Sequence, residues 1–130
     1  MALTLQLADP AGDLLPESYA ILDEELLEYF SGLASFPALR GLGELSPEAE
    51  TPIGEEAREA MAREAVEMAA LVQRREVPRP PDWVGLQGTG DLRLGEELGW
   101  TGLLGFLRRL EHLIHLARKM GLELWALPND

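Results

Sequence analysis

The sequence contains no cysteine among its 130 residues. Disulfide bonds, thiolate nucleophiles and cysteine-based zinc sites are therefore excluded. No apolar run approaches the roughly 20 residues of a membrane-spanning helix, and no lysine or arginine precedes Arg40, so the positively charged start of a signal peptide is missing. We therefore expect a soluble protein that lies in the cytoplasm and does not bind membranes.

Basic side chains are scarce in the first half of the chain. Residues 1–56 hold 12 acidic side chains and a single basic one, Arg40, and they carry almost all of the net charge of −12. A negative field of this kind opposes binding to nucleic acid and to anionic lipid. It keeps the protein soluble, and it also favours a partner with a basic surface.

Short strands are expected at both ends of the chain. Leucines alternate with polar residues over Leu3–Leu7, a pattern that is typical of a strand with one buried face. Apolar residues also alternate over Leu122–Leu127, which predicts a final strand. A further short strand is expected around Ser18–Leu22.

Three amphipathic helices are expected between these strands. Asp23 is placed to cap a helix over Glu24–Ala34, and Gly54 precedes a second helix that runs to about Arg75. A third is expected over Thr101–Met120, with Thr101 as its cap and Gly121 as its stop. The buried faces predicted from the helical spacing consist of Leu26, Leu27 and Phe30; of Ala57, Met61, Ala65, Met68 and Val72; and of Leu103, Leu107, Leu110, Ile114 and Ala117.

Proline and glycine mark the expected connections. Residues 36–53 contain three prolines and two glycines and are predicted to be irregular, and Val77–Pro81 must be extended because each proline restrains its predecessor. Residues 85–105 hold seven glycines and predict a flexible loop. Its stretch Gly85–Gly90 has the order GxxGxG and no Gly-Lys-Ser/Thr follows, so we expect no phosphate-binding loop.

These elements predict a single small α+β domain over residues 1–130. The N- and C-terminal strands are expected in one small sheet that packs against about three helices. Each terminal strand alone would leave its edges unpaired, so we expect the two to be neighbours.

The stretch Glu111–His115, with the sequence EHLIH, holds both histidines of the chain. On a helix His112 and His115 share a face with Glu111, but HxxH supplies two ligands at most, and the carboxylate does not stand as it does in HExxH. Arg118 and Lys119 would repel a metal ion from that face. No serine lies in GxSxG. We therefore expect no metal site, no cofactor and no enzymatic activity.

The side chains proposed for partner binding lie mostly in the irregular segments. Glu44, Glu48 and Glu50 belong to an acidic connection, and the three tryptophans, Trp83, Trp100 and Trp125, can anchor an interface. Trp83 precedes the glycine-rich stretch, and Trp100 lies within it. The hypothesis is a non-enzymatic protein-binding module for a basic partner, such as an immunity protein, an antitoxin-like inhibitor or a chaperone. The alternatives are a self-associating accessory protein, such as a homodimer, and a small enzyme.

The stretch Thr51–Glu56, followed by a long amphipathic helix, resembles a pattern in small uncharacterised bacterial α+β proteins. In those proteins a segment of the kind DT-[VI]-F-N opens the helix, and an apolar helix, a glycine and a short strand close the chain on an aspartate. Met120–Trp125 and Asp130 follow the same order here. The resemblance covers about half of the chain. It implies an α+β fold and assigns no site.

In size and acidity the chain is also similar to type III secretion chaperones, which are small, acidic α/β dimers. Those chaperones open with a helix, whereas this chain opens with the strand predicted at Leu3–Leu7. The similarity is therefore confined to length and charge.

Replacing His112 and His115 together by glutamine tests the absence of a structural metal. Because the pair lacks a third ligand and lies among basic residues, we expect the melting temperature to stay within a few degrees of the parent value. Thermal unfolding and elemental analysis of the two proteins measure the effect. Loss of bound zinc together with a large drop in stability would contradict the prediction.

Overall fold

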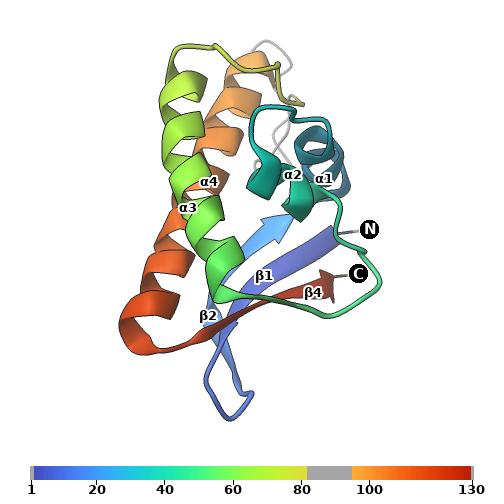
Figure 1. The fold of residues 1–130 in the computed structure, drawn as a ribbon. Helices are drawn as coiled ribbons and strands as arrows, with labels where there is room; N and C mark the ends of the chain where they lie inside the picture. The colour runs from blue at the N-terminus through green and yellow to red at the C-terminus, as the bar shows by residue number, and fades with distance from the viewer. Residues whose placement is uncertain (1, 82–94, 130) are drawn as a thin grey trace.

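A computed structural model describes residues 2–81 and 95–129. Within these residues four antiparallel strands form one sheet in the order β2-β1-β4-β3 (Figure 1). The N-terminal strand β1 therefore lies between β2 and the C-terminal strand β4, which confirms that the two terminal strands are neighbours. The strands are β1 (Ala2–Ala8), β2 (Leu14–Leu22), β3 (Thr51–Ile53) and β4 (Glu123–Asn129).

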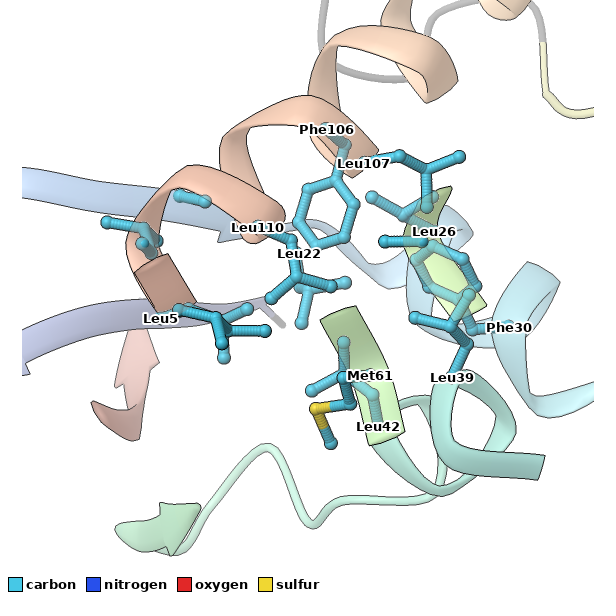
Figure 2. Packing of buried hydrophobic residues seen from close by; sticks show 14 of the residues in the cluster. Leu5, Leu22, Leu26, Phe30, Leu39, Leu42, Met61, Phe106, Leu107 and Leu110 are labelled. Carbon is cyan, nitrogen blue, oxygen red and sulfur yellow. The ribbon is translucent and has the colours of Figure 1, made fainter. Parts of the chain in front are cut away.

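Four helices pack on one face of this sheet. Side chains from that face, such as Leu5 and Leu22, meet side chains from every helix in one continuous core (Figure 2). The long helices α3 and α4 lie side by side, and the short helices α1 and α2 pack against each other (Figure 1). The α+β fold expected from the sequence is confirmed. The helices are α1 (Glu24–Ser31), α2 (Pro37–Gly43), α3 (Glu55–Gln73) and α4 (Gly95–Met120).

The capping signals predicted for the first two long helical segments, at Asp23 and Gly54, are confirmed. The Asp23 carboxylate accepts a hydrogen bond of 2.9 Å from the backbone N–H of Leu26, as an N-cap side chain does. Gly54 occupies the N-cap of α3. The buried stripe of α3 agrees with the predicted spacing except at Ala57, which is exposed because it lies in the first turn, before the helix reaches the core.

The prediction that residues 36–53 are irregular is wrong, since they contain α2 and β3. Helix α2 has no cap of its own, because Phe36 at its N-cap makes no side-chain hydrogen bond. Glu64 of α3 supplies the cap instead. Its carboxylate accepts hydrogen bonds from the backbone N–H of Ala38 at 2.9 and 3.0 Å and of Leu39 at 3.1 Å. The helix therefore depends on a distant side chain, which local sequence does not show.

The expected start of the last helix is also wrong. Helix α4 begins at Gly95, so Thr101 lies inside the helix rather than at its cap. The predicted glycine-rich loop falls outside the described residues over 85–94, and its remainder is helical. Burial of Trp100 and Leu103 against the core offsets the cost of about 1 kcal/mol for each helical glycine.

The segment that follows α3 is tied back to α1 by Tyr29. Its hydroxyl donates a hydrogen bond of 2.6 Å to the backbone carbonyl of Pro78. Burial raises the pKa of the Tyr29 hydroxyl far above its ordinary value, because the charged form would lose its hydration. The hydroxyl therefore remains a donor at every physiological pH.

Gly43 lies where α2 comes closest to α1. A Cβ atom placed on Gly43 would lie 2.4 Å from the backbone nitrogen of Ser31 and 2.6 Å from the carbonyl oxygen of Leu27. These neighbours are backbone atoms, which cannot turn aside as a flexible side chain can. Gly41 of the same helix has open space at its Cβ position and offers a matched control.

We expect Gly43→Ala to destabilise the protein by about 2–3 kcal/mol or more, because α1 and α2 must move apart. Gly41→Ala should be neutral or stabilising by up to about 1 kcal/mol, because alanine is the better helix former. Urea unfolding of the two variants measures the difference. Equal free energies of unfolding would show that the close packing of α1 on α2 is not as described.

Candidate functional site

The helices leave the other face of the sheet uncovered. The strand pairing aligns two rows of side chains on that face. One row crosses β2, β1 and β4 through Ile21, Thr4 and Leu127. The next row crosses all four strands through Tyr19, Gln6, Trp125 and Pro52. Tyr19 is 40% exposed and Ile21 is 48% exposed. We call this surface the open face, and it consists of Thr4, Gln6, Tyr19, Ile21, Pro52, Trp125 and Leu127.

The two rows of the open face contain no charged side chain, although 26% of the residues in the chain are charged. The water-facing side of an antiparallel sheet is ordinarily polar. Here Tyr19, Ile21, Trp125 and Leu127 make it aromatic and aliphatic. Depletion of charge combined with enrichment of aromatic side chains characterises the centre of a protein–protein interface.

A hollow of about 240 Å³ lies at one end of the open face. Trp125 and Leu127 of β4 form one side of it, and Leu14 of β2 contributes a side chain that is 45% exposed. The Trp125 indole N–H donates a hydrogen bond of 3.0 Å to the Glu123 carboxylate, which helps to fix the ring. The residues that line the hollow are Ala8, Gly12, Leu14, Glu50, Trp125 and Leu127.

The charged side chains around this hollow are acidic. Glu50 lines it directly, and Glu123 is bonded to the indole. Asp9 and Asp13 lie on either side of Gly12 in the turn between β1 and β2, where the Asp9 carboxylate accepts a hydrogen bond of 2.9 Å from the Asp13 N–H. An arginine or lysine of a partner would find there an aliphatic wall, an aromatic ring and a carboxylate, the combination that binds a cationic side chain.

The structure separates the acidic residues that the sequence analysis singled out. Glu44, Glu48 and Glu50 are all exposed, but only Glu50 lines the hollow. Glu44 lies 3.8 Å from the Arg40 guanidinium, an i,i+4 pair on α2 that already has its partner. The three glutamates are therefore not equivalent, and Glu50 is the one placed beside the open face.

Of the three predicted tryptophan anchors, Trp125 lies on the open face and Trp100 does not. Trp100 is only 5% exposed, and the Arg75 guanidinium carbon lies 4.8 Å from its ring centroid. The interpretation of Trp100 as a surface anchor is therefore corrected, since helix α4 begins early enough to carry it into the core. Trp83 lies outside the described residues.

Of the open face, sequence reasoning singled out Trp125 and missed its other residues. The signal was present in the alternation of the terminal strands, because burial of Leu124 and Ala126 places Trp125 and Leu127 on the opposite side. Tyr19 and Ile21 follow the same rule around the buried Ala20. Tyr19, Ile21, Trp125 and Leu127, which lie between the buried positions of these strands, are all uncharged.

Both histidines of EHLIH are exposed on α4. His115 lines a shallow depression between α3 and α4 that also includes Glu111 and Arg118. Arg118 is already paired, and its Nε donates a hydrogen bond of 2.9 Å to the Glu59 carboxylate. Over residues 2–81 and 95–129 there is no group of three or more His, Cys, Asp or Glu side chains that could hold a metal ion.

Comparison with known proteins gave no relative. No protein-family model matches the chain, and neither a curated protein nor a solved structure matches it. In the part of the chain that the structure describes, none of the helices has the length and apolar character that crossing a membrane requires.

Proposed function

We propose that the protein is a non-enzymatic binding module whose open face docks on a partner protein with a basic contact surface. The observation that carries this proposal is the uncharged centre of the open face, which ends at an acidic hollow. Apolar side chains at the centre provide affinity when water is excluded, and charges at the margin provide orientation and speed of association. Immunity proteins, antitoxin-like inhibitors and chaperones act in this way.

The residues of the hollow suit a basic side chain of the partner. A basic side chain of the partner lies over the Trp125 ring, its aliphatic part rests on Leu127, and its charge meets Glu50. A cation above an aromatic ring is stabilised by about 0.5–2 kcal/mol, more as water is removed. The net charge of −12 attracts such a partner over the Debye length of about 8–10 Å.

Self-association is the second function that an observation favours. An uncharged sheet face with Tyr19 and Ile21 exposed would also fit the same face of a second copy. Each copy carries a net charge of −12, however, and this charge opposes association of two copies at low salt. The basic partner is therefore the preferred proposal, and salt separates the two, since added salt weakens binding to a basic partner and strengthens self-association.

Leu127→Lys tests the position of the interface. The new ammonium group lies in the middle of the open face, where it would be buried without a partner and would repel a basic surface. We expect binding to the basic partner to weaken at least about tenfold, the effect of about 1.4 kcal/mol, with thermal unfolding little changed. Met120→Lys is the matched control, because Met120 is 61% exposed at the end of α4.

Surface plasmon resonance with the partner immobilised measures both variants. Equal loss of affinity in Leu127→Lys and Met120→Lys would reject the open face as the interface. Light scattering on the same samples identifies a dimer, and a parent dimer that Leu127→Lys dissociates, without any other partner, would favour self-association.

Replacing Glu44, Glu48 and Glu50 together by glutamine tests the role of charge. We expect the association rate with a basic partner to fall several-fold, because long-range attraction acts mainly on that rate. We expect Glu50→Gln alone to account for most of the loss, since Glu44 is paired with Arg40 and, of the three, only Glu50 lines the hollow.

Stopped-flow measurements at low and physiological salt check this expectation, and the double variant that retains Glu50 is the control. If the association rate is the same at both salt concentrations and in all of these glutamine variants, the acidic residues serve only solubility. Each substitution is on the surface, so stability should move by less than about 0.5 kcal/mol.

A further inference from the structure

A second concave surface lies at the edge of the sheet, between strand β2 and helix α4. Its volume is about 460 Å³, within the range of roughly 300–1,000 Å³ that is typical of small-molecule sites. We call it the edge groove. Its lining residues are Tyr19, Ala20, Ile21, Leu26, Thr101, Gly102, Gly105, Phe106 and Arg109.

The groove exists because α4 presents glycine where it passes β2. Gly102 and Gly105 line the groove without side chains, and a Cβ atom at Gly105 would meet nothing within 4 Å. The walls are aliphatic and aromatic, formed by Ile21, Leu26 and Phe106. Such a surface suits an apolar body, and the missing side chain at Gly105 is what makes room for it.

Arg109 is the charged side chain of the groove. Its Nε donates a hydrogen bond of 2.8 Å to the Tyr19 carbonyl, and its guanidinium carbon lies 5.9 Å from the Tyr19 ring centroid. These contacts hold the group in place and use one of its five N–H donors. The terminal nitrogens of Arg109 have no hydrogen-bond partner among the residues that the structure describes, and no acidic side chain of that part of the chain lines the groove.

We propose that the edge groove binds an amphipathic carboxylate, a small molecule with an apolar body and one carboxylate group. The apolar body lies against Leu26 and Phe106 and covers Gly105, and the carboxylate accepts hydrogen bonds from the terminal nitrogens of Arg109. A paired guanidinium and carboxylate is among the stronger polar contacts in proteins. The groove shares Tyr19 and Ile21 with the open face, but neither Trp125 nor Leu127 lines it.

The positive charge at this position is informative because the rest of the protein repels anions. A chain with a net charge of −12 attracts cations by default. A groove that binds carboxylates must overcome that field locally, and an anchored guanidinium does so. Preference for an anion over a cation of the same shape is therefore the signature of the site.

Titration of the protein with octanoate and with octylammonium tests the proposal, because their apolar chains have seven and eight carbons and their charges have opposite signs. NMR follows the backbone amide of Gly105 and the side-chain Nε–H of Arg109. We expect octanoate to shift both signals saturably and to bind about tenfold more tightly than octylammonium, a ratio that one charge-assisted contact provides.

Three variants make the test specific. Arg109→Gln should weaken octanoate binding about tenfold, while Arg108→Gln, the neighbouring exposed arginine that does not line the groove, should leave it unchanged. Gly105→Met should abolish binding because its side chain fills the groove. The same change should keep or raise the melting temperature, since methionine is a better helix former than glycine.

The proposal is overturned if octylammonium binds as tightly as octanoate, if the two arginine variants behave alike, or if Gly105→Met still binds octanoate. An Arg109→Gln variant that binds octanoate normally but aggregates would assign Arg109 to protection of the β2 edge instead. Leu127→Lys should bind octanoate as the parent does, so failure of this proposal and failure of the open face as an interface are distinguishable.

Discussion

Strand β1 is hydrogen-bonded on both sides, and most of the structure depends on that constraint. The N-terminal strand can take this central place only if the C-terminal strand β4 returns to lie beside it. Successive side chains of β1 point to opposite faces of the sheet, and this alternation has two consequences. Leu3, Leu5 and Leu7 are fully buried beneath the helices, while Thr4 and Gln6 are placed in the middle of the open face, between β2 and β4. The same pairing therefore builds the core and the proposed interface.

The sequence predicted the elements whose signals are local. Alternating leucines identified β1, and Asp23 identified the start of α1, because a capping carboxylate acts within one turn of its own position. Helix α2 was missed because its cap is Glu64, which lies on another helix. The early start of α4 was missed because burial of Trp100 outweighs the glycine content, and burial is a property of the assembled core.

The candidate site was predictable only in part, for the same reason. Acidity of the first half indicated a basic partner, and Glu50 was among the residues proposed for it. That Glu50 lies beside Trp125 follows from the pairing of β3 with β4, which joins residues far apart in the sequence. The open face and the edge groove meet at Tyr19 and Ile21, so strand β2 contributes to both surfaces. Strand β2 can contribute to both surfaces because it lies at the edge of the sheet.

The central claim is that the open face is where a different, basic protein docks. Site-specific photo-crosslinking in the native cells tests it most directly, with p-benzoylphenylalanine placed at Tyr19 on the open face and, as a control, at Val66, which is 52% exposed on α3. We expect a crosslinked species from position 19 whose second component, identified by mass spectrometry, is another protein joined through a basic surface. Its yield should fall as salt is raised. Equal crosslinking from both positions, or crosslinks only between two copies of this chain, would contradict it.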